Sequence, residues 1–339
     1  MDQLSRPLAA QLPFMALNGA LKAAGEATRL RILALLAEAE LTVSDLTDIL
    51  RQSQPRISRH LRLLAEAGLV ERFREGSWAF FRLGERSGNA ALARDLIARL
   101  DGADATIARD RERLAGVRAA RAAAAQAYFR RHAAEWDRIR KLHVADESVE
   151  HAIRSALADR PFRSLLDLGT GTGRMLELFG LEIERGLGLD LSHDMLALAR
   201  ARLDRAGLRH CSVRQGDIYD LALPKDSFDV VVIHQVLHFL DDSARAIREA
   251  ARVLRPGGRL LVVDFAPHDL EFLRDQHAHL RLGFAPETVT QWLGAAGLDL
   301  VEQRTLAPEP SSDGTIAVSL WLARDPRVAL AAPQALEVA

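Results

Sequence analysis

The sequence predicts two domains: a small, mostly helical domain that ends in a hairpin, and a larger α/β domain built on a parallel sheet. Two observations predict this fold class. In residues 1–88, apolar side chains recur at helical spacing and then give way to a short alternating pattern. From Arg163 onward, short apolar runs alternate with helical patterns, which is typical of a sheet with helices on both faces.

Composition bounds the function of the chain. Its 339 residues are 48% hydrophobic and 27% charged, with a net charge of −1, so any affinity for nucleic acid must come from a local patch. Cys211 is the only cysteine, which excludes an intramolecular disulfide and fits a reducing compartment. Residues 1–11 lack a signal-peptide pattern and no apolar stretch is long enough to cross a bilayer, so we expect a cytoplasmic protein.

Helical patterns cover most of the first domain. Apolar spacing predicts helices over 17–24 and 26–39. Thr42 or Ser44 can cap a short helix that runs through Leu50. These elements predict the first half of a helix-turn-helix.

A further helix and a hairpin complete this domain. Ser53 is placed to cap a helix on which Ile57, Leu61 and Leu64 face inward. The alternating residues 69–82 then predict two strands with a turn at Glu75-Gly76.

The second helix of the turn and the hairpin carry most of the basic charge of this domain. Residues 51–82 contain seven basic side chains against three acidic ones. A solvated basic face is the alternative explanation, but the order helix, turn, helix and hairpin favours DNA binding. The predicted DNA contacts are Gln54, Arg56, Ser58, Arg59 and His60 on the helix, and Arg72 and Arg74 on the hairpin.

Three segments resemble the ArsR/SmtB family of winged-helix repressors. Residues 21–33 are similar to the opening of that fold, 52–61 to its recognition helix and 66–82 to its wing. The resemblance implies a homodimer that binds double-stranded operator DNA and changes its affinity when a ligand binds. Members that sense arsenic carry Cys-Val-Cys-Asp-Leu where this chain has Thr-Val-Ser-Asp-Leu at 42–46, so we predict no metal site.

Residues 90–140 are rich in the helix formers Ala, Arg and Leu. A 4-3 apolar spacing, with Asp110 at one seam position, predicts either a dimer helix of coiled-coil type or an amphipathic helix packed on its own domain. Gly102 and Gly116 are candidate helix breaks. The residues of the spacing are Leu96, Leu100, Ala103, Ile107, Leu114 and Val117.

These patterns divide the sequence into four parts. We predict a winged-helix domain over 1–88, a helical connector and dimerisation helix over 89–127, a second domain over 128–325 and a tail over 326–339.

A glycine-rich loop organises the second domain. The first strand, 164–168, leads into Gly169-Thr170-Gly171-Thr172-Gly173, whose backbone can lie close to a polar ligand. Arg174 occupies the last glycine position of the dinucleotide fingerprint, which argues against NAD. The further predicted strands are 186–190, 210–215, 228–233 and 259–265, followed by an antiparallel pair, 298–305 and 315–323.

Acids lie at the ends of three of these strands: Asp167, Asp190 and Asp217. With the glycine loop and the turn at 254–258, they resemble class I S-adenosylmethionine-dependent methyltransferases, a Rossmann-like fold. The resemblance implies that Asp190 binds the ribose of S-adenosylmethionine and that Asp217 accepts from its adenine amine. The implied cofactor contacts are Asp167, Gly169, Thr170, Gly171, Gly173, Asp190, Leu191, Met195, Asp217, Ile218 and His234.

Histidines follow the fourth strand and are the candidate catalytic groups. His234 and His238 could act as a base, while His268, His277 and His279 could line an acceptor site. Arsenite methyltransferases of this fold use several cysteines, so the lone Cys211 disfavours that substrate.

Together these features predict a bifunctional protein. It would be a transcriptional regulator that responds to S-adenosylmethionine or S-adenosylhomocysteine, and a methyltransferase for an unidentified small-molecule acceptor. The alternative is a small-metabolite methyltransferase whose winged helix serves mainly for dimerisation.

Overall fold

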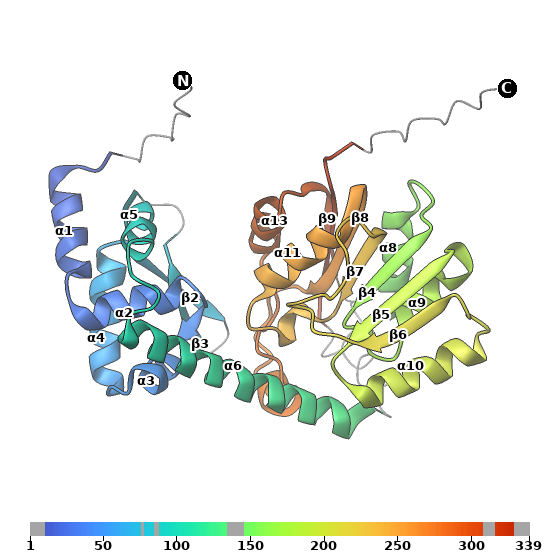
Figure 1. Ribbon diagram of the computed structural model, residues 1–339, viewed down its shortest axis with the longest axis horizontal. Coiled ribbons are helices and arrows are strands. Elements are labelled where there is room, and N and C mark those ends of the chain that lie inside the picture. The colour runs from blue at the N-terminus through green and yellow to red at the C-terminus, as the bar shows by residue number, and fades with distance from the viewer. Residues whose placement is uncertain (1–10, 76–77, 85–87, 134–145, 308–315, 329–339) are drawn as a thin grey trace. The chain divides into compact units, whose positions relative to one another are not determined.

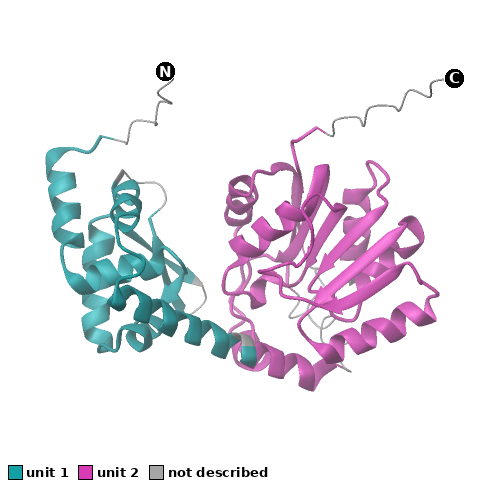
Figure 2. Ribbon diagram, in the orientation of Figure 1, with its two compact units in different colours: residues 1–123 teal, residues 124–339 magenta. Residues whose placement is uncertain are grey.

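The computed structural model describes residues 11–75, 78–84, 88–133, 146–307 and 316–328 (Figure 1). The chain forms two compact units, residues 1–123 and 124–339 (Figure 2). The change from one unit to the other falls inside helix α6, Ala105–His132. No helix in the described ranges has the length and hydrophobicity to cross a membrane.

The first unit is the predicted helix-turn-helix with a wing. Its apolar core draws on every helix, with Ile57, Leu61 and Leu64 buried as the spacing predicts. A three-stranded sheet of order β1-β3-β2 forms the wing. The elements before the connector are α1 (Phe14–Ala24), α2 (Ala27–Leu36), β1 (Leu41–Thr42), α3 (Val43–Leu50), α4 (Gln54–Glu66), β2 (Val70–Glu75) and β3 (Trp78–Leu83).

Helix α3 begins with a capping box. The Thr42 Oγ1 atom accepts from the backbone N–H of Asp45 at 3.2 Å, and the Asp45 carboxylate accepts from the N–H of Thr42 at 2.8 Å. Thr42 is therefore the cap, rather than Ser44. Ser53 precedes α4 as expected, but its side chain makes no capping hydrogen bond. Gly76 of the predicted wing turn lies outside the described residues.

The connector differs from the predicted coiled-coil seam. Helix α5 (Gly88–Ile97) ends before Gly102, whereas α6 passes through Gly116 without a break. Leu114 is buried in the core of the first unit, and Leu96 and Val117 pack against that core. These three of the six seam residues therefore pack on the first unit, which agrees with the second alternative for this part of the spacing.

A seven-stranded sheet, of order β6-β5-β4-β7-β8-β10-β9, forms the centre of the second unit. The first five strands in this order are parallel, and β10 and β9 are antiparallel, which confirms the predicted closing pair. The order reverses between β4 and β7, where ligands bind in open α/β sheets. The strands are β4 (Ser164–Leu168), β5 (Arg185–Asp190), β6 (Cys211–Gln215), β7 (Phe228–His234), β8 (Leu254–Phe265), β9 (Asp299–Leu306) and β10 (Val318–Arg324).

Helices cover both faces of this sheet (Figure 1). One apolar core packs the sheet against α8, α9 and α10, and a second packs it against α11 and α13. The helical elements are α8 (Asp146–Leu157), α9 (Arg174–Phe179), η2 (Gly180–Glu182), α10 (His193–Arg205), η3 (Leu237–Phe239), α11 (Ser243–Val253), α12 (Phe272–His277) and α13 (Pro286–Ala295).

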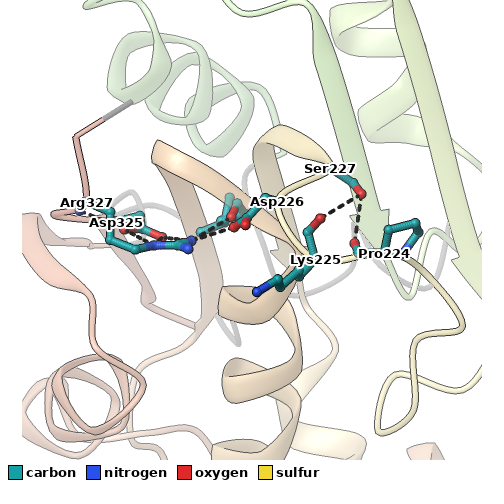
Figure 3. A network of polar contacts seen from close by, with 7 residues as sticks. Pro224, Lys225, Asp226, Ser227, Asp325 and Arg327 are labelled. Atoms are coloured by element: carbon teal, nitrogen blue, oxygen red, sulfur yellow. Dashed lines mark hydrogen bonds and ion pairs between the residues drawn. The ribbon is translucent and has the colours of Figure 1, made fainter. Parts of the chain in front are cut away.

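Residues beyond β10 also belong to this unit. Arg327, which the sequence assigned to a tail, binds the carboxylates of Asp325 and Asp226 at 2.6 and 2.7 Å (Figure 3). Nearby, the hydroxyl of Ser227 donates to the carbonyl of Pro224 at 2.7 Å. Strand β8 begins at Leu254, so it includes the segment that the sequence predicts as a turn.

Candidate functional site

The glycine loop lies at the carboxyl end of β4, beside the point where the strand order reverses. Gly169 and Gly171 have φ angles of 70° and 53°, which glycine adopts without strain. A Cβ atom on Gly169 would lie 2.4 Å from Val236, so this position also requires glycine for packing. The hydroxyl of Thr170 donates to the Asp167 carboxylate at 2.6 Å and thereby fixes the loop to its strand.

Asp190, at the end of β5, holds the other side of the loop. One carboxylate oxygen accepts from the N–H of Gly171 at 2.9 Å, and the other from the N–H of Ser192 at 2.8 Å. Burial raises the pKa of Asp190, and these backbone hydrogen bonds oppose that effect. A carboxylate has about four lone-pair sites, so the side chain can still accept from two hydroxyls of a ligand.

The other predicted cofactor residues lie around the same edge of the sheet but differ in exposure. Asp217 is exposed and accepts from the N–H of Tyr219 at 2.9 Å. Ile218 and Met195 are buried, whereas Leu191 is exposed. Ser192 caps α10 by accepting from the N–H of Met195.

The two candidate catalytic histidines occupy different environments. His234 is the last residue of β7 and is partly buried. His238 lies on η3 with 2% of its side chain exposed, and its Nδ1 atom is 2.7 Å from the Oδ1 atom of Asp264. Asp264, on β8, is fully buried.

Three further predicted histidines lie in the segment after β8. The ring of His279 is 4.3 Å from that of His238, and His277 is 6.5 Å from His279. The hydroxyl of Tyr128, on α6, is 2.6 Å from the Nδ1 atom of His277. Burial raises the pKa of Tyr128 to about 12, so the phenol keeps its proton at neutral pH. The structure thus gathers a histidine and aromatic cluster beyond the ends of β7 and β8.

Helix α4 presents four of the predicted DNA contacts to solvent. The exposed residues are Gln54, Arg56, Ser58 and Arg59, opposite the buried apolar stripe. Arg72 and Arg74 are also exposed on β2 of the wing. These positions suit side chains that meet a phosphate backbone and base edges.

His60 departs from the predicted outward orientation. Its side chain is 12% exposed, and its Nδ1 atom lies 3.7 Å from the carboxylate of Glu26. Burial lowers the pKa of His60, helped by three nearby arginines and opposed by Glu26. A helical repeat of 3.6 residues brings position 60 near the stripe of 57, 61 and 64, which explains its burial.

Two features of the second unit were missed by the sequence reasoning. The guanidinium of Arg174, at the start of α9, forms a bidentate pair with Glu150 of α8 at 2.6 and 2.7 Å, which fastens α8 beside the glycine loop. Asp264 was the other omission. The rule that singled out acids at strand ends could have found it, because it follows a buried apolar run.

Comparisons with known proteins match both parts of the chain. Residues 26–72 match the family described as "Bacterial regulatory protein, arsR family", and residues 166–262 match "Methyltransferase domain". An uncharacterised methyltransferase of Bacillus subtilis, YcgJ, is 32% identical over 137 residues, which are 40% of this chain and 54% of that protein.

Two further proteins are each similar to part of this chain. A Mycolicibacterium smegmatis protein named "Probable S-adenosylmethionine-dependent methyltransferase/" is 41% identical over 30% of this chain and 37% of its own length. The structure of the N-methyltransferase NodS of Bradyrhizobium japonicum, in complex with S-adenosyl-L-homocysteine, has a TM-score of 0.45 at 23% identity, covering 54% of this chain and 87% of NodS. The chain spans about half or less of the length of these curated relatives.

Proposed function

We propose that this protein is a DNA-binding regulator that binds S-adenosylmethionine and transfers its methyl group to a small molecule. The chain carries an arsR-family helix-turn-helix followed by a methyltransferase domain. The arrangement of Asp190 and the glycine loop is the observation that carries this proposal. It is supported by the two family matches and by the printed name of the M. smegmatis relative.

The residues at the carboxyl end of the sheet fit this cofactor. Asp190 has lone pairs left to accept from two ribose hydroxyls, and the loop 169–173 allows close approach of a ligand to the backbone. Asp217 is exposed where an adenine amine could donate to it. When bound, S-adenosylmethionine supplies an electrophilic methyl group; the chain binds and orients the reactants.

The first unit supports operator binding. Arg56 and Arg59 are exposed on a helix whose opposite face is buried, and Arg72 and Arg74 extend the basic surface onto the wing. A homodimer on a palindromic operator is part of the proposal. The alternative, in which the winged helix serves only to dimerise, leaves this basic surface without a purpose.

A binding experiment separates the two activities. Isothermal titration of the full chain with S-adenosylhomocysteine should show one site per chain, and Asp190→Ala should weaken it about 100-fold, because about 3 kcal/mol of charge-assisted hydrogen bonding is lost. Absence of binding to the unmodified chain would refute the cofactor proposal. Fluorescence anisotropy with the duplex upstream of the chain's own gene, at fixed salt, tests the regulator separately.

A further inference from the structure

The buried carboxylate of Asp264 has an incomplete set of partners. It lies between Val263 and Phe265 on a central strand, where carboxylates are costly to bury. Its Oδ1 atom accepts from the N–H of Phe265 at 2.8 Å and from Nδ1 of His238. Its Oδ2 atom has no hydrogen-bond partner within the part of the chain that the structure describes. Packing alone does not account for an acid here.

The Asp264 carboxylate fixes the tautomer of His238. Because an ionised carboxylate only accepts hydrogen bonds, the Nδ1 atom of His238 carries the proton and donates it. The lone pair of the imidazole is then on Nε2, the atom that can take up a proton from another molecule. A carboxylate that orients a histidine and stabilises its protonated form is the arrangement that general bases use.

His268 presents the opposite tautomer in the same cluster. Its Nδ1 atom accepts from the N–H of Leu270 at 3.3 Å, and burial lowers its pKa to about 4, so the ring is neutral at pH 7 with the proton on Nε2. That Nε2 donor is buried and has no partner among the described residues. The centroid of the His268 ring lies 5.9 Å from that of Phe265, and the centroid of the Phe265 ring lies 4.7 Å from that of His238.

Gln235 adds a second buried donor beside Asp264. It directly follows β7 with a φ of 56°, a conformation that is uncommon for a residue with a side chain. Its N–H donates to the carbonyl of Val263 at 2.7 Å. Gln235 therefore lies next to Asp264, which follows Val263 on the neighbouring strand β8. Gln235 is 6% exposed, and within the described ranges its Nε2 atom has no hydrogen-bond partner. Among the described residues, this cluster therefore holds three buried polar atoms without a hydrogen-bond partner, which are Asp264 Oδ2, Gln235 Nε2 and His268 Nε2.

Resting on the proposed methyl transfer, we propose that His238 is the catalytic base for an acceptor whose nucleophilic atom is an N–H or O–H, and that Asp264 is its positioning residue. The lone pair of the acceptor atom forms the new bond to the methyl carbon, and the carbon–sulfur bond breaks with its electron pair going to sulfur. The acceptor proton goes to Nε2 of His238, and Asp264 stabilises the resulting imidazolium.

The aromatic surroundings narrow the acceptor to a small molecule with a flat ring. The rings of Phe239 and His279 lie 4.1 and 4.3 Å from that of His238, and Phe265 stacks on His279. Such walls stack against an aromatic ring and attract a cationic group.

Catechol and benzylamine are suitable probes, because the first offers only O–H groups and the second only N–H groups. Full-length protein is incubated with S-adenosylmethionine and each probe, and S-adenosylhomocysteine release is followed. We expect methylation of one probe, which identifies the acceptor atom. If the chain binds S-adenosylhomocysteine but methylates neither probe, the acceptor class is overturned; if it does not bind, the proposed function itself has failed.

Variants test the roles of the two residues. His238→Ala should lower kcat on the order of 10²–10⁴-fold with unchanged cofactor affinity, and added imidazole should restore part of the rate. Asp264→Asn should lower kcat more than it changes KM, because it disturbs the orientation of His238 and leaves substrate binding in place. His210→Ala, which removes a ring bound to the Gly180 carbonyl, is the matched control and should retain activity.

Two results would overturn the assignment. If His238→Ala retained full kcat, or lost it without any rescue by imidazole, His238 would not be the base. If Asp264→Asn left kcat unchanged, Asp264 would not position His238.

Discussion

At the scale of single residues, the raised pKa of Asp190 couples cofactor affinity to pH. The ionised carboxylate is the form that accepts hydrogen bonds from the ribose hydroxyls. Protonation of the carboxyl group therefore competes with cofactor binding. Because burial raises this pKa, affinity for S-adenosylhomocysteine should begin to fall at a pH above the ordinary aspartate range of about 3.9. Calorimetric titration between pH 8 and pH 4.5 measures this decline.

Asp190→Asn is the control for that titration. It should bind about tenfold or more weakly at pH 7, because hydrogen bonds to a charged acceptor are the stronger ones, and its affinity should be nearly independent of pH. An equal decline in both proteins would assign the pH dependence to another group.

Asp229 should stabilise the second unit in a pH-dependent way. Burial raises its pKa, but hydrogen bonds from Ser164, Arg255 and the Arg163 N–H outweigh that effect, and the net pKa is lowered. The stabilisation is complete above the unfolded pKa of about 3.9 and is lost as pH falls through the folded value. Asp229→Asn should therefore lower the free energy of unfolding by about 2 kcal/mol at pH 7.

Urea denaturation at pH 7, 5 and 3.5 checks this expectation. The difference between the unmodified chain and Asp229→Asn should persist at pH 5 and narrow at pH 3.5. The exposed Asp204→Asn serves as control, and a difference that grew with acidity would contradict the argument.

The sequence predicts the placement of residues well where it depends on local pattern. Acids at strand ends and glycines in a loop are visible within a few positions, and the structure places Asp167, Asp190 and the loop together. The pairing of His238 with Asp264 depends on two strands being neighbours, a relation that no local spacing encodes.

At the scale of elements, a buried ion pair holds α6 to the helix-turn-helix. Asp110, the polar residue in the apolar seam, binds Arg31 of α2 in bidentate fashion at 2.6 and 2.7 Å, with 3% of its side chain exposed. Asp110→Asn should lower the stability of the first unit by about 3 kcal/mol, because the guanidinium loses its counter-ion.

Hydrogen exchange of the amides in α2 and α6 measures this loss separately from the second unit. The double variant Arg31→Met with Asp110→Leu should recover most of it, since apolar residues of similar volume replace the pair. A double variant as unstable as Asp110→Asn would show that the pair has a further role.

The exposed face of α4 should set the salt dependence of DNA binding. Replacing both Arg56 and Arg59 by Ala should reduce the slope of log K against log salt by about 2, because two phosphate contacts are lost. Anisotropy titrations over a range of salt concentrations give the slope. The matched pair Arg205→Ala and Arg209→Ala, exposed in the second unit, should leave it unchanged.

The connector shows where sequence reasoning reaches its limit for elements. A 4-3 apolar spacing reports that one face of a helix is buried, but not which surface buries it. Here Leu114 belongs to the core of its own domain. Dimerisation therefore remains a prediction from the family resemblance.

At the scale of the whole molecule, the regulator hypothesis predicts reciprocal coupling. If S-adenosylhomocysteine changes the affinity for operator DNA by some factor, DNA must change the affinity for S-adenosylhomocysteine by the same factor, typically about 5- to 150-fold. Anisotropy with saturating cofactor product and calorimetry with saturating DNA measure the two factors at one salt concentration. If both measured factors were one, DNA binding and cofactor binding would not be coupled, and the regulator hypothesis would be wrong.

The strand order of the second unit has a consequence for biosynthesis. The last strand, β10, is inserted between β8 and β9, and its Leu320 and Trp321 are completely buried. A nascent chain that lacks residues 318–324 leaves β8 with an open edge and exposes the apolar positions that β10 covers. This unit can therefore complete its sheet only after translation of β10, and products that terminate earlier should be substrates for chaperones and proteases.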